Sequence, residues 1–357
     1  MSEINRRKFL KTLLAGSGSL LIAPVISACQ PAQASPSVPT KEQPAEPSPT
    51  QSVPTPTAVP PTETAAQATE QPLIPTDTAL PQAAEPSGTP EMVVVRGPKE
   101  PEELVRRAIA GLGGMNRFVK QGANVIIKPN ICVAYHTYEY AATTNPWVVG
   151  ALVKLCLEAG AASVKVMDFP FGGTAPEAYT KSGIEEQVKA AGGEMAFMRS
   201  IKYVDTEIPQ GVDLKSTSMN DDILKADVVI NVPIAKTHGL ARLTLGMKNM
   251  LGVVRDRPSM HWNLGQRLAD ITSRIRPALT VVDAIRILTA NGPTGGNLDD
   301  VKKLDTIVAS PDIVAADSYA TSFFNMLPND LDYIVAGAAM GLGKSDLSQV
   351  KIEEIAA

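Results

Sequence analysis

The chain has 357 residues, of which 33 are Lys or Arg and 37 are Asp or Glu, so its formal net charge is −4. An acidic balance of this kind argues against a nucleic-acid partner, because such partners select basic surfaces. The 3 cysteines are too few for the full ligand set of a cysteine-ligated iron–sulfur cluster or a zinc knuckle, since one of them, Cys29, has another expected role.

The first 29 residues predict a secretory signal. Residues 5–11 (NRRKFLK) form a twin-arginine pattern, and an apolar stretch broken by Gly16 and Gly18 follows it. This stretch is too short and too interrupted to predict a membrane span. The tetrad Ile26-Ser27-Ala28-Cys29 resembles a bacterial lipobox, with Ile in place of the usual Leu at its first position. We therefore expect twin-arginine export, cleavage before Cys29 and an extracytoplasmic protein lipid-anchored to the cell membrane through Cys29. An uncleaved N-terminal anchor is the alternative.

Residues 30–91 differ from the rest of the chain in composition. They hold 15 of the 29 prolines and no aromatic residue, and they are rich in Thr and Ala. A segment of this kind cannot bury enough apolar surface to offset the entropy of ordering it, so we expect a disordered linker. A spacer that lifts the folded part off the membrane is the favoured interpretation, and a specific ligand-binding segment is the alternative.

From residue 92 to residue 357 short β-rich runs alternate with helical stretches. The pattern predicts a buried strand over 124–128, a helix from Pro146 to Gly160, a strand over 163–167 and a helix over 176–191. Further strands are expected over 194–198, 203–208, 227–232, 279–282 and 304–309, with a helix starting at 310–312. This βαβ order predicts an α/β fold with a mainly parallel sheet flanked by helices, either as one large domain or as two small lobes.

Polar residues follow several of the predicted strands. Lys128 and Asn130 come after the first buried strand, Asp168 and Asp283 close two others, and Lys236 with His238 follows the strand over 227–232. Because ligands collect at the carboxyl ends of parallel strands, we expect these residues to line a common site at the edge of the sheet. At such an edge, replacement of Lys236 or His238 is expected to cost about 1 kcal/mol of stability or less. The alternative is a set of separate caps and surface ion pairs.

A second polar cluster lies downstream of this strand. It contains Lys248 and Asn249, and His261 follows shortly after. Lys128, Lys236 and Lys248 would together bind an anion such as a phosphate or a carboxylate. His238 or His261, with Asp168 or Asp283 in support, would be the catalytic residues that move a proton, although an ordinary hydrogen-bonded role is as good an interpretation of each histidine. The spacing of these residues matches no compact metal-binding motif, so no metal ligand is predicted.

Two cysteines remain outside the lipobox. Cys156 falls on the apolar stripe of the helix that starts at Pro146, which is typical of a core thiol. Whether it pairs with Cys132 outside the cytoplasm is left open by the sequence.

The order of these motifs resembles one known family, the DUF362 family of bacterial and archaeal proteins. The resemblance covers residues 92 to 350, and it is carried by Lys128-Pro129-Asn130, Thr143-Thr144, Asp168, Lys236-Thr237-His238, Lys248-Asn249 with Gly252, His261, Asp283, Gly292-Pro293 and Asp312 with Asp317. The family has no general assigned activity. Some members occur with ferredoxin-type iron–sulfur modules, which implies a redox setting, but this chain lacks the cysteines of such a module.

Two hypotheses for the function follow. In the favoured one, the protein is an enzyme that acts on an anionic substrate or cofactor, with the cofactor itself unknown. In the other, the same residues bind an anion or a metal ion without turnover, in a lipoprotein that serves a membrane or redox partner.

Overall fold

The alternating pattern forms one large sheet in residues 88–357, which are the part of the chain that the computed structural model describes. The predicted signal, the lipobox with Cys29 and nearly all of the predicted linker lie outside the described residues. Within the described range, no helix is both long enough and apolar enough to cross a membrane.

The sheet of the described range has ten strands, and eight of them form a continuous path in the order β12-β1-β11-β10-β7-β2-β3-β4. These strands are β1 (Met92–Arg96), β2 (Asn124–Pro129), β3 (Ser163–Val166), β4 (Glu194–Met195), β7 (Val228–Val232), β10 (Leu279–Leu288), β11 (Val301–Ser310) and β12 (Ile352–Ala356). Of the two others, β8 (Ile234–His238) pairs with β10, and β9 (Arg242–Thr244) pairs with β8.

Most neighbouring strands run parallel, as the sequence predicted. The central strand β2 pairs in parallel with β7 on one side and β3 on the other, and β10 pairs in parallel with β7 and β8. The antiparallel pairs are those of β11 with β1 and β10, and of β8 with β9. The prediction of an α/β fold with a mainly parallel sheet is therefore confirmed, and the carboxyl ends of β2, β3 and β7 meet at one edge.

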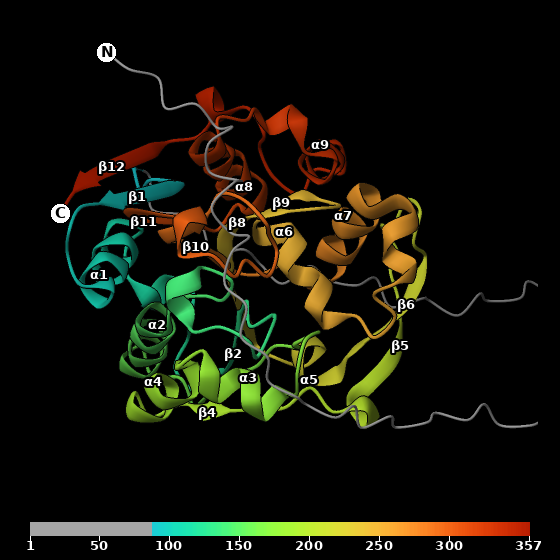
Figure 1. The fold of residues 1–357 in the computed structure, drawn as a ribbon, viewed down its shortest axis with the longest axis horizontal. Helices are drawn as coiled ribbons and strands as arrows, with labels where there is room; N and C mark the ends of the chain where they lie inside the picture. The colour runs from blue at the N-terminus through green and yellow to red at the C-terminus, as the bar shows by residue number, and fades with distance from the viewer. Residues whose placement is uncertain (1–87) are drawn as a thin grey trace, which may run out of the picture. The chain divides into compact units, whose positions relative to one another are not determined.

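Helices cover both faces of the sheet (Figure 1). On one face α1 (Pro101–Gly111), α2 (Pro146–Glu158) and α4 (Ile184–Ala190) pack on Val93, Val125 and Ile230. On the other face α6 (Gly246–Asn249), α7 (Leu264–Ile275), α8 (Ile313–Ala320) and α9 (Asp332–Ala339) pack on Val94 and Val229. Neighbouring residues of one strand point to opposite cores because side chains alternate across a strand.

Several predicted elements differ in extent from the observed ones. The helix expected over 176–191 is two helices, α3 (Ala175–Lys181) and α4, because Gly183 between them has a φ of 76°. Only Glu194 and Met195 of the strand expected over 194–198 are extended. The strand expected over 203–208 is β5 (Tyr203–Glu207), which pairs with β6 (Ser216–Asn220) in a separate two-stranded sheet. The one short helix between β6 and β7 is α5 (Asp221–Leu224). Residues 88–357 fall in one compact unit and not in two lobes.

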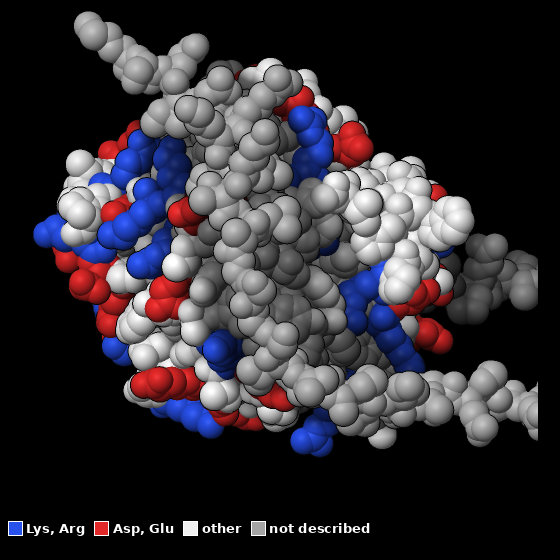
Figure 2. Space-filling view, in the orientation of Figure 1, with Lys and Arg blue, Asp and Glu red and all other residues white. Residues whose placement is uncertain are grey.

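Charged side chains of both signs lie side by side on the part of the visible face that grey atoms leave uncovered (Figure 2). The interior shows a different distribution. Lys128 and Lys236 are among the largest fully buried side chains of the described residues. Since buried lysines are rare unless they are paired or bind something, their surroundings define the candidate site.

Candidate functional site

The ends of the central strands surround a cavity of about 70 Å³. Lys128 and Asn130 reach it from the end of β2, Asp168 from the end of β3, and Lys236 with His238 from β8. Lys248 and Asn249 reach it from α6. The structure thus brings together seven of the nine predicted site residues, which the sequence distributes over more than a hundred positions.

A buried ion pair joins two of these strands. Lys128 Nζ donates to Asp168 Oδ1 at 2.7 Å, and the side chains are 1% and 5% exposed. The other carboxylate oxygen of Asp168 accepts from the backbone N–H of Ile131 at 2.6 Å. Burial lowers the pKa of Lys128, an effect that Asp168 opposes and that Arg257 and Lys236 reinforce. Each carboxylate oxygen of Asp168 therefore already has a hydrogen-bond partner within the protein.

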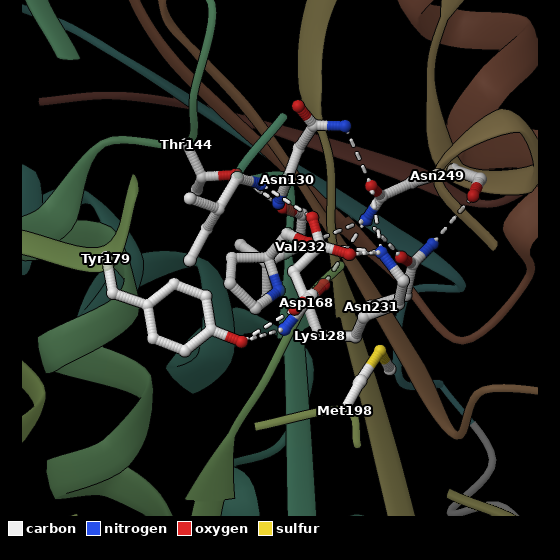
Figure 3. A network of polar contacts seen from close by, with 12 residues as sticks. Lys128, Asn130, Thr144, Asp168, Tyr179, Met198, Asn231, Val232 and Asn249 are labelled. Atoms are coloured by element: carbon white, nitrogen blue, oxygen red, sulfur yellow. Dashed lines mark hydrogen bonds and ion pairs between the residues drawn. The ribbon is translucent and has the colours of Figure 1, made fainter. Parts of the chain in front are cut away.

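Three asparagines connect this ion pair to α6 (Figure 3). Asn249 Oδ1 accepts from Lys128 Nζ at 3.2 Å and from Asn130 Nδ2 at 3.0 Å. Asn249 Nδ2 donates to Asn231 Oδ1 at 2.9 Å, and Asn231 Nδ2 donates to the carbonyl of Gly246 at 3.0 Å. The hydrogen bonds set the orientation of each of these three side-chain amides. The network therefore holds the cavity wall in one arrangement.

Among the described residues, Lys236 has no carboxylate partner. Its Nζ donates to Asn130 Oδ1 at 3.0 Å, to the carbonyl of Ala142 at 2.5 Å and to the carbonyl of Pro293 at 2.9 Å, and it lies 3.2 Å from Cys132 Sγ. The residue is 1% exposed. Neutral oxygens thus solvate a buried cation, and its charge is not neutralised by an acid. The glycine-rich turn around Pro293 contributes one of these carbonyls.

Lys248 is different again. It is 8% exposed, and its Nζ makes no hydrogen bond or ion pair with any described residue. Burial, with Lys236 and Lys128 adding to it, lowers the pKa of Lys248 to about 8. Among the described residues the Lys248 amine is thus a donor without a partner, on a largely buried side chain that lines the cavity.

His238 is held as a neutral imidazole. Its Nδ1 accepts from the backbone N–H groups of Leu240 at 3.1 Å and Ala241 at 3.2 Å, so the proton of the neutral ring lies on Nε2. Burial lowers the pKa of His238 to about 3, with Lys248 and Lys236 contributing. The sequence left a proton-moving role and an ordinary hydrogen-bonded role open for this histidine. The two amide contacts at Nδ1 are of the second kind and leave Nε2–H as a donor.

Eight further residues that the sequence analysis did not single out as site residues line the cavity, among them Arg257, Phe169, Thr244 and Cys132. The Arg257 guanidinium lies 3.7 Å from the ring centroid of Phe169, and its Nη1 has no hydrogen-bond partner in the described part of the chain. Thr244 Oγ1 is likewise buried without a partner. Cys132 follows Asn130 by two positions, and in an extended chain this spacing places both side chains on one side. That spacing could have identified Cys132 as a residue of the site. No comparable sequence signal marks Arg257.

Glycine is required where the chain passes closest to the ion pair. A Cβ on Gly252 would lie 2.6 Å from Asp168 Oδ1 and 2.9 Å from Lys128 Nζ. These distances are shorter than real Cβ contacts, so the Gly252 backbone forms a close wall of the cavity.

Two residues that the sequence predicted to be catalytic, His261 and Asp283, do not line this cavity. His261 is exposed on the turn at Ser259–Asn263, where its Nδ1 lies 3.2 Å from the carbonyl of Pro258. Asp283 is buried within β10 and accepts from the backbone N–H groups of Asn145 at 2.7 Å and Ile285 at 3.0 Å. Because the sheet extends past residue 282, Asp283 lies inside a strand and not at its end.

The predicted small effect of replacing Lys236 is also revised, because this side chain is buried and not at an exposed edge. Both described cysteines are free: Cys156, on the buried side of α2, packs in the core, and Cys132 faces the cavity. No group of three or more His, Cys, Asp or Glu residues in the described range is arranged to hold a metal ion.

Comparisons with known proteins agree with the resemblance seen in the sequence. The family described as "Domain of unknown function (DUF362)" matches residues 125–322, more than half of the chain. A thylakoid-associated protein of Synechocystis sp. is 28% identical over 253 residues, which are 67% of this chain and 74% of that protein.

Two solved structures are also similar. The lactate racemase apoprotein from Thermoanaerobacterium thermosaccharolyticum matches with 12% identity and a TM-score of 0.38, over 67% of this chain and 58% of that one. A protein from Thermotoga maritima matches with 12% identity and a TM-score of 0.40, over 65% of this chain and 60% of that one. The present chain thus spans about three fifths of each of these structures.

Proposed function

The chain belongs to the DUF362 family, a family of unknown function, and from that premise we propose that it is an enzyme that binds a small anionic substrate or the anionic group of a cofactor in the cavity at the ends of β2, β3 and β8. Within the described residues that line this cavity, Lys128, Lys236, Lys248 and Arg257 are cations and Asp168 is the one carboxylate. This excess of positive charge is the observation that carries the proposal.

The cations that remain uncompensated face the cavity. Asp168 is paired with Lys128, whereas Lys248 has no partner and Lys236 contacts neutral oxygens and a thiol. Buried polar groups without partners are rare in folded proteins, and Arg257 Nη1 and Thr244 Oγ1 are two such groups at this cavity, which the unpaired Lys248 also lines. A bound anion would satisfy them together, with His238 Nε2–H as a further donor.

The size of the cavity limits what enters it. A volume of about 70 Å³ is well below the roughly 300–1,000 Å³ of pockets for drug-sized ligands. We therefore propose that the ligand is a small anion such as a carboxylate or a phosphate, or the anionic end of a larger molecule.

Isothermal titration of the mature protein with sulfate, phosphate and acetate tests the proposal. At least one anion should bind, and Lys248→Met should weaken its binding by about tenfold or more, since a hydrogen bond to a charged group contributes roughly 1.5–3 kcal/mol. Lys120→Met is the matched control, because Lys120 is an exposed lysine outside the cavity. Equal affinities in the Lys248 and Lys120 variants, or no binding of any anion, would contradict an anion site here.

A binding protein without turnover is the second candidate function, and the hydrogen-bond network around Asn249 is the observation that favours it. The asparagines satisfy one another, and His238 is held neutral, so neither supplies a proton-transfer group. Mass spectrometry of protein purified from its own membrane separates the two candidates. Both a substrate and its product should co-purify with an enzyme, whereas a single unchanged anion should co-purify with a binding protein.

We further propose that the domain works outside the cytoplasm, tethered to a membrane through lipidated Cys29 and serving or contacting a membrane partner. The twin-arginine pattern and the lipobox-like tetrad support this location. The Synechocystis relative is named as thylakoid-associated, and thylakoids are membrane compartments, which adds support for a location at a membrane.

A further inference from the structure

The three lysines of the cavity differ in whether their amine is free to react. Lys128 Nζ is tied to Asp168, Asn249 and the carbonyl of Pro129. Lys236 Nζ is surrounded by three oxygens and a sulfur. In the described part of the chain, Lys248 Nζ has neither a hydrogen bond nor an ion pair. The Lys248 residue as a whole is 8% exposed, and it lines the cavity. Of the three, only the Lys248 amine can approach a ligand without first breaking a contact.

The backbone that carries Lys248 is fixed in place. Asp317 accepts from the backbone N–H groups of Gly246 at 2.5 Å and Met247 at 2.9 Å, which are the first residues of α6. On the cavity side the adjacent Asn249 is held by three side chains. Lys248 thus extends from a rigid support, as a reacting group should.

We propose that Lys248 is a nucleophile that forms a Schiff base with a small carbonyl compound carrying a carboxylate, that is, a 2-oxo acid; this deepens and rests on the proposed anion site. The Lys248 nitrogen attacks the carbonyl carbon, and a C–N bond forms as the carbonyl oxygen takes up a proton. That oxygen then leaves as water. In total, the ammonium and the carbonyl give a protonated imine and one water, with no change in charge and no oxidant or reductant.

The surroundings suit each part of such a ligand. Amine nucleophiles in proteins are activated by desolvation and by neighbouring cations, and Lys248 has both. Its pKa of about 8 leaves part of the amine unprotonated near neutral pH. The carboxylate of the ligand would meet the cations that remain, Lys236 and Arg257, while Asp168 stays paired with Lys128. A phosphate would satisfy the same cations but would leave the amine without a carbonyl to attack.

Reductive trapping tests the inference. The mature protein is incubated with glyoxylate or pyruvate and sodium cyanoborohydride, digested, and analysed by peptide mass spectrometry. We expect the reduced adduct at Lys248 and not at Lys128 or Lys236. Lys248→Arg keeps the positive charge but has no primary amine, so it should lose the cavity adduct entirely. Because the adduct is located directly in the unaltered protein, the result stands even if a variant folds poorly.

Controls separate this inference from the anion site on which it rests. Acetate has the carboxylate but no reactive carbonyl, so it should compete with glyoxylate and slow the trapping at Lys248. If glyoxylate binds in titration but no adduct forms at Lys248, the Schiff base is refuted and the anion site stands. If glyoxylate does not bind but sulfate or phosphate does, the Schiff base is likewise refuted and the anion site stands. If none of these anions binds, the proposed function itself fails. Labelling that is equal at Lys248 and at exposed lysines such as Lys120 would also overturn the inference.

Discussion

Lys128 and Asp168 are both removed from water, so each depends on the other. Desolvation of an ion costs several kcal/mol, and only a close partner with further hydrogen bonds offsets that cost. The 2.7 Å contact and the N–H of Ile131 provide both. Exposed pairs such as Lys202–Asp222, at 3.0 Å, have little effect on stability because water solvates both groups in the unpaired state.

This contrast gives a prediction about stability. Lys128→Met leaves the Asp168 carboxylate buried without its cation, and we expect it to lower the free energy of unfolding by about 3–5 kcal/mol. Lys202→Met, the exposed control, should change it by about 0–1 kcal/mol. Urea denaturation measures both. In the double variant Lys128→Met/Asp168→Leu the loss should be smaller than in Lys128→Met alone, and a larger loss would contradict the interpretation.

A second residue-scale prediction concerns pH and the charge on Lys248. The groups that face it are Lys236, Lys128, Arg257, His238, Asp168 and Cys132. Because the pKa of Lys248 is lowered to about 8, its ammonium is present below pH 8 and is lost above it. His238, with a pKa of about 3, stays neutral throughout this range.

Affinity for sulfate should therefore fall as pH rises above about 8, by up to roughly tenfold per pH unit. Isothermal titration from pH 6 to about pH 10 measures this decline. Lys248→Arg stays charged and should show no such decline. The Cys132 thiol also faces the cavity, and comparison in a Cys132→Ser background removes its contribution. A decline of the same size in Lys248→Arg would show that another group is responsible.

At the scale of elements, short segments position the site through buried carboxylates. Asp317 on α8 holds the first amides of α6, and Asp283 in β10 holds the amide of Asn145 at the start of α2. A Cβ on Gly246 would lie 2.7 Å from Asp317 Oδ1, so glycine at this position permits the contact. Burial raises the pKa of Asp317 to about 7 and that of Asp283 to about 6. Both acids thus support the cavity from outside it.

The raised pKa of Asp317 predicts a pH-dependent stability. Its folded value of about 7 exceeds the model-compound value of 3.8, so the folded state binds the proton more tightly. The resulting stability is fully present below about pH 4 and is lost as pH rises to about 7. Asp317→Asn cannot titrate, and it accepts fewer amide protons. The difference in unfolding free energy between the original protein and Asp317→Asn should fall from pH 4 to pH 7 and then level off. A difference that stays constant across this range would refute the assignment.

At the scale of the whole molecule, the described domain and its proposed anchor occupy different parts of the sequence. The last described strand, β12, pairs with the first, β1, so the two ends of the described domain lie side by side at one edge of the sheet, with Met92 opposite Ile352. The proposed lipid attachment site, Cys29, lies before Met92 in the sequence. Attachment should therefore be removable without harm to the fold.

Cys29→Ala tests this separation. The variant should no longer partition into the detergent phase, because the lipobox cysteine is the expected lipid attachment site. Its thermal unfolding should match that of the unaltered protein, since Cys29 lies outside the described domain. Detergent-phase partitioning and circular dichroism provide the two measurements. Full retention of the variant in the detergent phase would mean that another segment anchors the chain.

The sequence by itself determined the fold class, the family and most of the cationic site. Continuous apolar runs at 124–128 and 227–232 predict buried parallel strands, and the polar residues after such strands meet at one edge for a reason of geometry. Lys128, Asp168, Lys236, His238 and Lys248 could therefore be assigned to one site from local pattern alone.

Only the tertiary structure decided what each of these residues can do. Asp283 has the same local pattern as Asp168, but β10 continues past it and encloses it, whereas β3 ends before Asp168. The neutral state of His238 depends on two backbone amides and on nearby lysines. The Lys248 amine has no carboxylate partner in the cavity because Asp168 is paired with Lys128. Burial and partners come from segments distant in the chain, and protonation and reactivity depend on them. Sequence pattern therefore places a group, and the surrounding fold sets its chemistry.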